Sequence, residues 1–262
     1  MMTKNNLSLG GLFALSALSL ISLAGCGGTS PTLSRVVGES RTFGTGKVET
    51  WAMVDSSGMV SEVGATIPMT LVRDLATTPP GDGPLGAVAS LKYPEVVRQK
   101  TFFNTLALHA NPQGHPGAYY LTPHFDVHFY NVPDATIRTY NPDDPGSQAS
   151  SVVLPAGYVM EPFGVPQMGT HAISHADHEA LNGERKFIKT MIQGYYNGKV
   201  VFVEPMVTQE LMLSKESFTL PVPQPAKFGL AAPTLYPTKF WADYNATNDS
   251  YEFHYSDFVM VQ

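Results

Sequence analysis

Three polar side chains that could bind a metal or move a proton alternate with apolar residues between Thr122 and Tyr130. In an extended strand, side chains two positions apart lie on the same face. His124, Asp126 and His128 would therefore share one face, with about 7 Å between successive positions on it. The opposite face would carry phenylalanine and valine. A strand with one apolar face and one His/Asp/His face is the strongest candidate site in the chain.

The polar face of this strand has two interpretations. Two histidines two positions apart can reach one cation, because neutral imidazole is a good ligand for Zn, Cu, Fe and Ni ions. Asp126 between them could be a third ligand, or it could accept a hydrogen bond that fixes a histidine tautomer. Alternatively, the polar face points to solvent or into a hydrogen-bonded interior. The spacing alone leaves both interpretations open.

Three further residues could complete a metal site. His115 lies in a turn that precedes the strand, and His171 follows a segment rich in proline and glycine. Glu204 ends an apolar run, where its carboxylate could be a ligand or a general base acting on a metal-bound water. Taken separately, each histidine could be a surface residue, and Glu204 could be a buried carboxylate that accepts hydrogen bonds from backbone amides. Together with the strand they predict one divalent transition-metal site formed by His124, His128 and His171, with Glu204 or His115 completing it and Asp126 in support.

Turn-forming residues are frequent in the chain, which has 23 glycines and 21 prolines among 262 residues. This density favours many short elements joined by tight turns over long helices. Alternating apolar residues predict strands at 47–55, 59–67, 100–109, 119–130, 238–245 and 251–261. We therefore expect an α+β fold that is predominantly antiparallel β, with a sheet or barrel-like core and a few short helices.

A hairpin is predicted at Asn197-Gly198, which separates two apolar runs. Asn-Gly suits a type I′ turn, because both central residues must take positive φ. A two-residue loop pairs Tyr196 with Lys199, and an unbroken register then places Glu204 opposite Met191. In that register, the face of Glu204 also carries Val200, Phe202, Gln193 and Met191.

The N-terminal segment has the pattern of a bacterial lipoprotein signal. Lys4 and a short apolar run at 12–21 precede Leu23-Ala24-Gly25-Cys26, which resembles a lipobox. The run is too short and too interrupted by serine and glycine to favour a membrane-spanning helix. We expect a signal peptide at 1–25, a lipidated Cys26 with a flexible tether at 26–45, and one β-rich domain at 46–262.

This pattern also predicts where the protein resides. A lipid on Cys26 would anchor it in the cell envelope, on the extracytoplasmic side of the membrane. Gly27 follows the cysteine where an aspartate would otherwise stand, which in a Gram-negative cell leaves a lipoprotein free to reach the outer membrane.

Several kinds of chemistry find no support in the sequence. Cys26 is the only cysteine, so a mature domain lipidated there has neither disulfides nor thiolate ligands. The chain has a net charge of -6 and its charged residues are dispersed, which gives no reason to expect nucleic acid as a partner. No nucleotide-binding motif or nucleophile elbow is present, so we expect no nucleotide cofactor. The remaining candidate partners are the membrane, a small-molecule ligand and a second copy of the chain.

Five motifs, taken together in this order, resemble a known protein family. They are Asn111–Pro116, Pro123–Tyr130, Met168–His171, Glu204–Thr208 and Tyr236–Thr238. The set is similar to an uncharacterised family of exported bacterial proteins, a domain of unknown function whose named example comes from Thermus. The resemblance covers roughly 46 to the C-terminus and implies a β-rich exported domain with no established activity. The chain departs from the expected pattern at Gly117, in place of proline, and at Ala172, in place of tryptophan.

Two functions from different classes follow from these observations. The first is a lipid-anchored extracytoplasmic protein that binds or transforms a small molecule at a His/Asp/Glu transition-metal site, with Glu204 as the candidate catalytic residue. The alternative is a metal-free ligand-binding or structural envelope protein, whose polar strand face is a hydrogen-bonded interior or a subunit interface. In that case, loss of His124 and His128 would leave buried partners unpaired, at about 1–3 kcal/mol each.

A third interpretation, a copper-handling or redox-stress lipoprotein, rests on the 11 methionines. Their scattered positions are better explained by core filling.

Overall fold

The computed structural model describes residues 32–144, 153–181 and 185–262. The predicted signal peptide and Cys26 lie outside these residues. Among the residues that are described, no helix is both long enough and apolar enough to cross a membrane.

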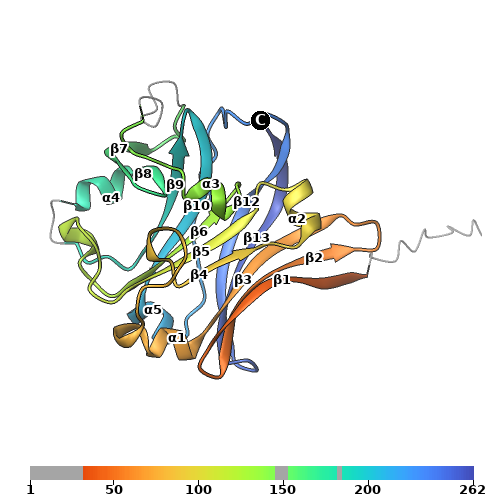
Figure 1. Ribbon diagram of the computed structural model, residues 1–262, viewed down its shortest axis with the longest axis horizontal. Helices are drawn as coiled ribbons and strands as arrows, with labels where there is room; N and C mark the ends of the chain where they lie inside the picture. The colour runs from red at the N-terminus through yellow and green to blue at the C-terminus, as the bar shows by residue number, and fades with distance from the viewer. Residues whose placement is uncertain (1–31, 145–152, 182–184) are drawn as a thin grey trace, which may run out of the picture. The chain divides into compact units, whose positions relative to one another are not determined.

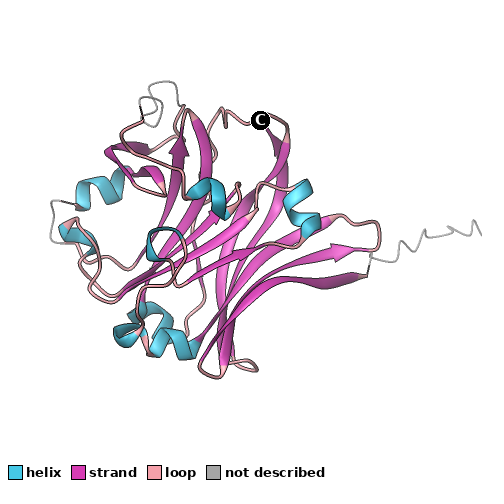
Figure 2. Ribbon diagram, viewed as in Figure 1, coloured by secondary structure: helices cyan, strands magenta, loops and turns pink. Residues whose placement is uncertain are grey.

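Two antiparallel sheets dominate the fold (Figures 1 and 2). The first sheet has the spatial order β1 (Leu33–Phe43), β2 (Gly46–Asp55), β3 (Val60–Pro68), β13 (Ser250–Val261), β12 (Thr234–Asn245) and β11 (Phe218–Thr219). The second has the order β4 (Ala89–Lys92), β5 (Thr105–Asn111), β6 (His124–Tyr130), β10 (Lys199–Thr208), β9 (Lys189–Tyr196), β8 (Gly169–Ser174) and β7 (Tyr158–Val165).

Short helices connect the strands. The α-helices are α1 (Met69–Arg73), α2 (Glu95–Lys100), α3 (Asp134–Ile137), α4 (His175–Ala180) and α5 (Gln209–Ser214). The described segments also contain the 3-10 turns η1 (Leu75–Thr77), η2 (Pro84–Gly86) and η3 (Ala118–Tyr120). The predicted α+β class with mainly antiparallel strands is confirmed. Each sheet ends in edge strands, β1 and β11 in one and β4 and β7 in the other, so the core consists of open sheets and not a closed barrel.

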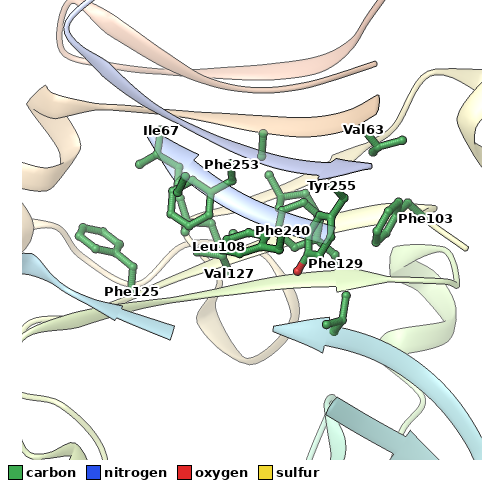
Figure 3. Packing of buried hydrophobic residues seen from close by; sticks show 14 of the residues in the cluster. Val63, Ile67, Phe103, Leu108, Phe125, Val127, Phe129, Phe240, Phe253 and Tyr255 are labelled. Atoms are coloured by element: carbon green, nitrogen blue, oxygen red, sulfur yellow. The ribbon is translucent and has the colours of Figure 1, made fainter. Parts of the chain in front are cut away.

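An aromatic core separates the two sheets (Figure 3). Phe253 and Tyr255 of β13 extend from the first sheet, while Val127 and Phe129 of β6 extend from the second. The ring centroids of Phe129 and Tyr255 are 4.8 Å apart in an edge-to-face arrangement. The alternation of β6 therefore sends its apolar residues into the sandwich and its polar residues to the opposite face of the second sheet.

A second, smaller cluster covers that opposite face. Tyr130 and Phe202 of the sheet pack there with Tyr120 of η3 and with Phe187. All seven residues of β6 are buried as a result. The polar face of this strand thus lies beneath a covering layer and not against solvent.

The prediction of a flexible tether through 45 is wrong for 33–43, which form strand β1. Nine positions of this strand are exposed and only two are half-buried. An edge strand of this kind is held by backbone pairing with β2, for example Val36 with Ala52, and not by burial of one face. Its sequence therefore lacks the apolar alternation that would distinguish it from a linker.

Replacement of a core phenylalanine tests the sandwich. Phe253→Ala should lower the free energy of unfolding by about 3–5 kcal/mol, because the ring is fully buried and its removal leaves a cavity. Phe163→Ala, on an exposed position of β7, is the matched control and should change stability by less than about 0.5 kcal/mol. Equal effects of the two substitutions in denaturant unfolding would contradict this packing.

Candidate metal centre

Strand β6 carries the three polar residues that the sequence singles out. It lies between β5 and β10, near the middle of the second sheet. His124, Asp126 and His128 all point away from the sandwich core, and their residues are 0%, 4% and 0% exposed. Their placement on one face is as predicted. Because they are buried, the interpretation of this face as a solvent-exposed surface is ruled out.

Glu204 reaches the same face through an irregularity in β10. The hairpin forms as predicted, with Lys199 paired to Tyr196 and positive φ at Asn197 and Gly198. A β-bulge between Val200 and Phe202 then shifts the register by one residue. Because of the extra residue, every side chain after the bulge lies on the opposite face of the sheet from the one that an unbroken register predicts.

The bulge corrects the predicted surroundings of this carboxylate. Glu204 is paired with Ile192 and not with Met191. Val200 and Met191 belong to the core between the sheets, whereas Phe202 and Ile192 belong to the outer cluster. Without the bulge Glu204 would point into the sandwich, and with it the carboxylate faces the histidines of β6.

One group of candidate ligands consists of His128, His171 and Glu204. Nε2 of His128 lies 3.3 Å from Oε2 of Glu204, and Nε2 of His171 lies 3.8 Å from the same oxygen. One potential ligand atom from each residue lies within 4.8 Å of the others, and all three residues are buried. Three strands, β6, β8 and β10, hold the three side chains. Two imidazoles and a carboxylate in this arrangement could hold a metal ion.

Several polar atoms of this group lack a hydrogen-bond partner among the described residues. They are both ring nitrogens of His128, Nδ1 of His171 and Oε2 of Glu204. A buried polar atom without a partner is destabilising, at roughly 1–3 kcal/mol each. A cation bound among these atoms would satisfy several of them at once.

Burial also sets the protonation of the group. Burial raises the pKa of Glu204 well above its usual value, and the negative charges of Asp126 and Glu161 add to the shift. Burial lowers the pKa of His128 far below its usual value and that of His171 to about 4. Without a metal, burial therefore favours neutral imidazoles and disfavours the ionised form of the carboxyl.

The second group of candidate ligands consists of His115, His124 and Asp126. Nε2 of His124 lies 3.0 Å from Oδ1 of Asp126, and Nε2 of His115 lies 3.7 Å from Oδ2 of the same carboxylate. Here too, one potential ligand atom from each residue lies within 4.8 Å of the others. Asn111 donates a hydrogen bond of 2.8 Å to Oδ2 of Asp126.

The protonation of this group differs from that of the first. Burial acts to raise the pKa of Asp126, but its contact with His124 and the charges of the surrounding histidines outweigh burial, and the net pKa is lowered. Burial likewise acts to lower the pKa of His124, yet the nearby Asp126 carboxylate raises it. The pKa of Asp126 is therefore shifted downward, whereas that of Glu204 is shifted upward.

The structure thus brings together all six residues that the sequence selects, but in two groups and not around one point. It also adds His109, which the sequence analysis did not select. This residue is 6% exposed, its ring centroid lies 4.9 Å from that of His128, and its Nδ1 has no hydrogen-bond partner among the described residues. His109 reaches this face because it is paired with Asp126 across β5 and β6, and the sequence alone does not show that pairing.

A groove of about 630 Å³ opens near the His124 end of β6 and is lined by Tyr119, Arg185, Lys189, Thr208 and Glu210 among others. Thr208 is paired with His124 across the sheet. None of the six candidate ligands lines the groove. The unpartnered buried atoms, and not the groove, therefore locate the candidate chemistry.

No family model, curated protein or solved structure matches this chain.

The low pKa of His171 predicts a pH dependence of stability in the chelator-treated protein. Between pH 6.5 and about 4 the unfolded chain protonates this histidine while the folded protein does not. The neutral His171 therefore contributes its full stabilisation above pH 6.5, and this contribution is lost as the pH falls toward 4. We expect the free energy of unfolding, measured with urea, to fall between pH 7 and pH 4.5. This fall should be about 2 kcal/mol smaller in His171→Gln than in the unchanged protein.

The exposed His178 provides the control, since His178→Gln should keep the full loss. An unchanged pH dependence in His171→Gln would show that this imidazole is not held neutral by burial.

Proposed function

We propose that this protein is a lipid-anchored, extracytoplasmic protein that binds a divalent transition-metal ion at His128, His171 and Glu204. The observation that carries the proposal is the state of His128. It is fully buried, both of its ring nitrogens lack a hydrogen-bond partner among the described residues, and one lies 3.3 Å from a buried carboxylate. A metal ion explains why these groups are buried together.

The ligand set narrows the class of cation. Two imidazoles and one carboxylate suit zinc or iron(II), and such sets leave coordination positions open for water or substrate. Metal ions that prefer thiolate ligands are disfavoured, because the only cysteine is Cys26, which lies outside the domain. With a metal bound, Glu204 in its ionised form would serve as a ligand or would hold a proton from a water beside the ion.

Two buried tyrosines beside the candidate ligands favour an additional small-molecule ligand. The ring of Tyr130 stacks on that of His128 at 5.4 Å, and the ring of Tyr120 lies 5.3 Å from that of His115. The hydroxyls of Tyr120 and Tyr130 are buried and have no hydrogen-bond partner among the described residues. Burial raises the pKa of both hydroxyls, and the charge of Glu204 contributes to each shift. The phenol of Tyr130, whose ring stacks on His128, could donate a hydrogen bond to a ligand that reaches the metal.

The metal-free alternative requires that the polar face form hydrogen bonds across an interior. Asn111 and Asp126 do so, and Nδ1 of His124 contacts the carbonyl oxygen of Thr122 at 2.6 Å. His128 does not, since neither of its ring nitrogens finds a partner in the described part of the chain. Nε2 of His124 and Oδ1 of Asp126 are likewise without a partner among the described residues. The alternative therefore accounts for only some of the polar atoms on this face.

Membrane attachment rests on the pattern at Leu23-Ala24-Gly25-Cys26 and on the segment of small and polar residues that follows it. The family resemblance, which implies export, supports the same location. A lipid on Cys26 would place the metal-binding domain at the membrane surface.

Removal of a ligand histidine should remove metal. The untagged full-length chain, purified without chelator, should lose about one equivalent of bound transition metal on His171→Ala, because the remaining two ligands hold a cation weakly. His178→Ala, an exposed histidine outside the group, is the control and should leave the metal content unchanged. Elemental analysis showing equal metal in both variants would refute the proposal.

Cys26→Ser tests the anchor independently of the metal. The unchanged chain, expressed in a bacterial host that processes lipoproteins, should partition into the detergent phase and incorporate labelled palmitate. The variant should do neither, because serine offers no thiol for acylation. Palmitate incorporation by Cys26→Ser would place the lipid elsewhere or show that the signal is of another kind.

A further inference from the structure

We infer that His115, His124 and Asp126 form a second cation site, separate from the His128 group, which takes a divalent first-row transition ion and exchanges it with solvent. Like the first group, it combines two imidazoles with one carboxylate, but one of its imidazoles lies at the surface. The inference stands on the geometry of these three residues and does not depend on the proposed function.

The orientation of His124 provides the first step. Its Nδ1 lies 2.6 Å from the carbonyl oxygen of Thr122, and a carbonyl can only accept a hydrogen bond, so Nδ1 carries the proton. In the neutral ring, Nε2 then presents its lone pair toward Oδ1 of Asp126, 3.0 Å away. A lone pair and a carboxylate oxygen at this distance repel each other unless a proton or a metal ion lies with them.

His115 repeats the arrangement from the other side. Its Nδ1 lies 3.3 Å from the carbonyl oxygen of Pro116, which leaves Nε2 as the ligand atom, 3.7 Å from Oδ2 of Asp126. The rings of His115 and His124 are 4.8 Å apart. Histidines that bind metals are commonly oriented in this way, with the second nitrogen donating to a backbone carbonyl.

The surroundings of Asp126 are those of a supported ligand. Asn111 holds Oδ2 with a hydrogen bond of 2.8 Å, while Oδ1 has no hydrogen-bond partner among the described residues. Nε2 of the fully buried His124 is also without a partner, despite its short distance to Oδ1. One atom of the carboxylate is thus fixed and the other is aimed at an unpartnered imidazole nitrogen.

Exposure separates the two sites. The side chain of His115 is 36% exposed, whereas those of His171, His128 and Glu204 are 9%, 0% and 2% exposed. An ion held by His115 can leave when this one side chain rotates. An ion in the other group has to pass the covering layer, so the two ions should exchange at different rates.

Cobalt(II) is the probe for the test, because its absorption reports coordination by nitrogen and oxygen. The full-length chain, stripped with chelator and titrated with cobalt(II), should bind about two equivalents. Added EDTA should remove them in two phases. In His115→Ala, about one equivalent should bind and the fast phase should be absent. Asp126→Asn, which keeps the volume of the side chain, should give the same result, and His178→Ala should behave as the unchanged chain.

Each outcome decides one question. His115 is partly exposed, so His115→Ala should fold, and an unchanged thermal transition verifies this. Loss of one equivalent in His171→Ala, with none lost in His115→Ala, would overturn the second site while leaving the first intact. Loss of one equivalent in His115→Ala, with none lost in His171→Ala, would support the second site and overturn the first. One equivalent in the unchanged chain, with His115→Ala unaffected, would show that His124 and Asp126 are a protonated ion pair.

Discussion

The burial of a carboxylate beside neutral imidazoles is the constraint on which this site depends. Glu204 is 2% exposed, and ionising a group so far from water is costly unless a positive charge lies next to it. His128 and His171 cannot supply that charge, because burial keeps both neutral near pH 7. The fold can resolve this in two ways: a proton stays on the carboxyl, or a cation replaces the proton.

Asp126 resolves the same constraint differently, although it lies on the same strand face. Nε2 of His124 lies 3.0 Å from its Oδ1, and Asn111 donates a hydrogen bond to its Oδ2. The pKa values of the two carboxylates are therefore shifted in opposite directions, that of Asp126 downward and that of Glu204 upward. Environment and not residue type sets this difference, as is usual where neighbouring carboxylates have separate roles.

The sequence predicts those parts of the fold and site that depend on local pattern. The two-residue alternation of β6 is strict, so the face shared by His124, Asp126 and His128 could be derived without a structure. The Asn197-Gly198 turn was predictable for a similar reason, since few residues tolerate positive φ. In both cases the information lies within a few consecutive residues.

The features that escaped prediction depend on contacts between distant segments. Strand β1 is held by pairing with β2, and its exposed residues carry no apolar pattern. His109 joins the site only because β5 pairs with β6 in one particular register. The separation of the six candidate ligands into two groups depends on where three strands and a turn meet, and no spacing within the sequence encodes that.

The β-bulge after Val200 makes chain length, and not residue identity, the feature on which Glu204 depends. Deleting one residue between Gly198 and Phe202 would keep every ligand in the sequence yet turn this carboxylate into the aromatic core. Related chains that have lost or gained a residue here would thus carry the glutamate without carrying the site. In following this protein through evolution, the number of residues from the Asn-Gly turn to the Glu-Pro pair is a stricter marker than the glutamate itself.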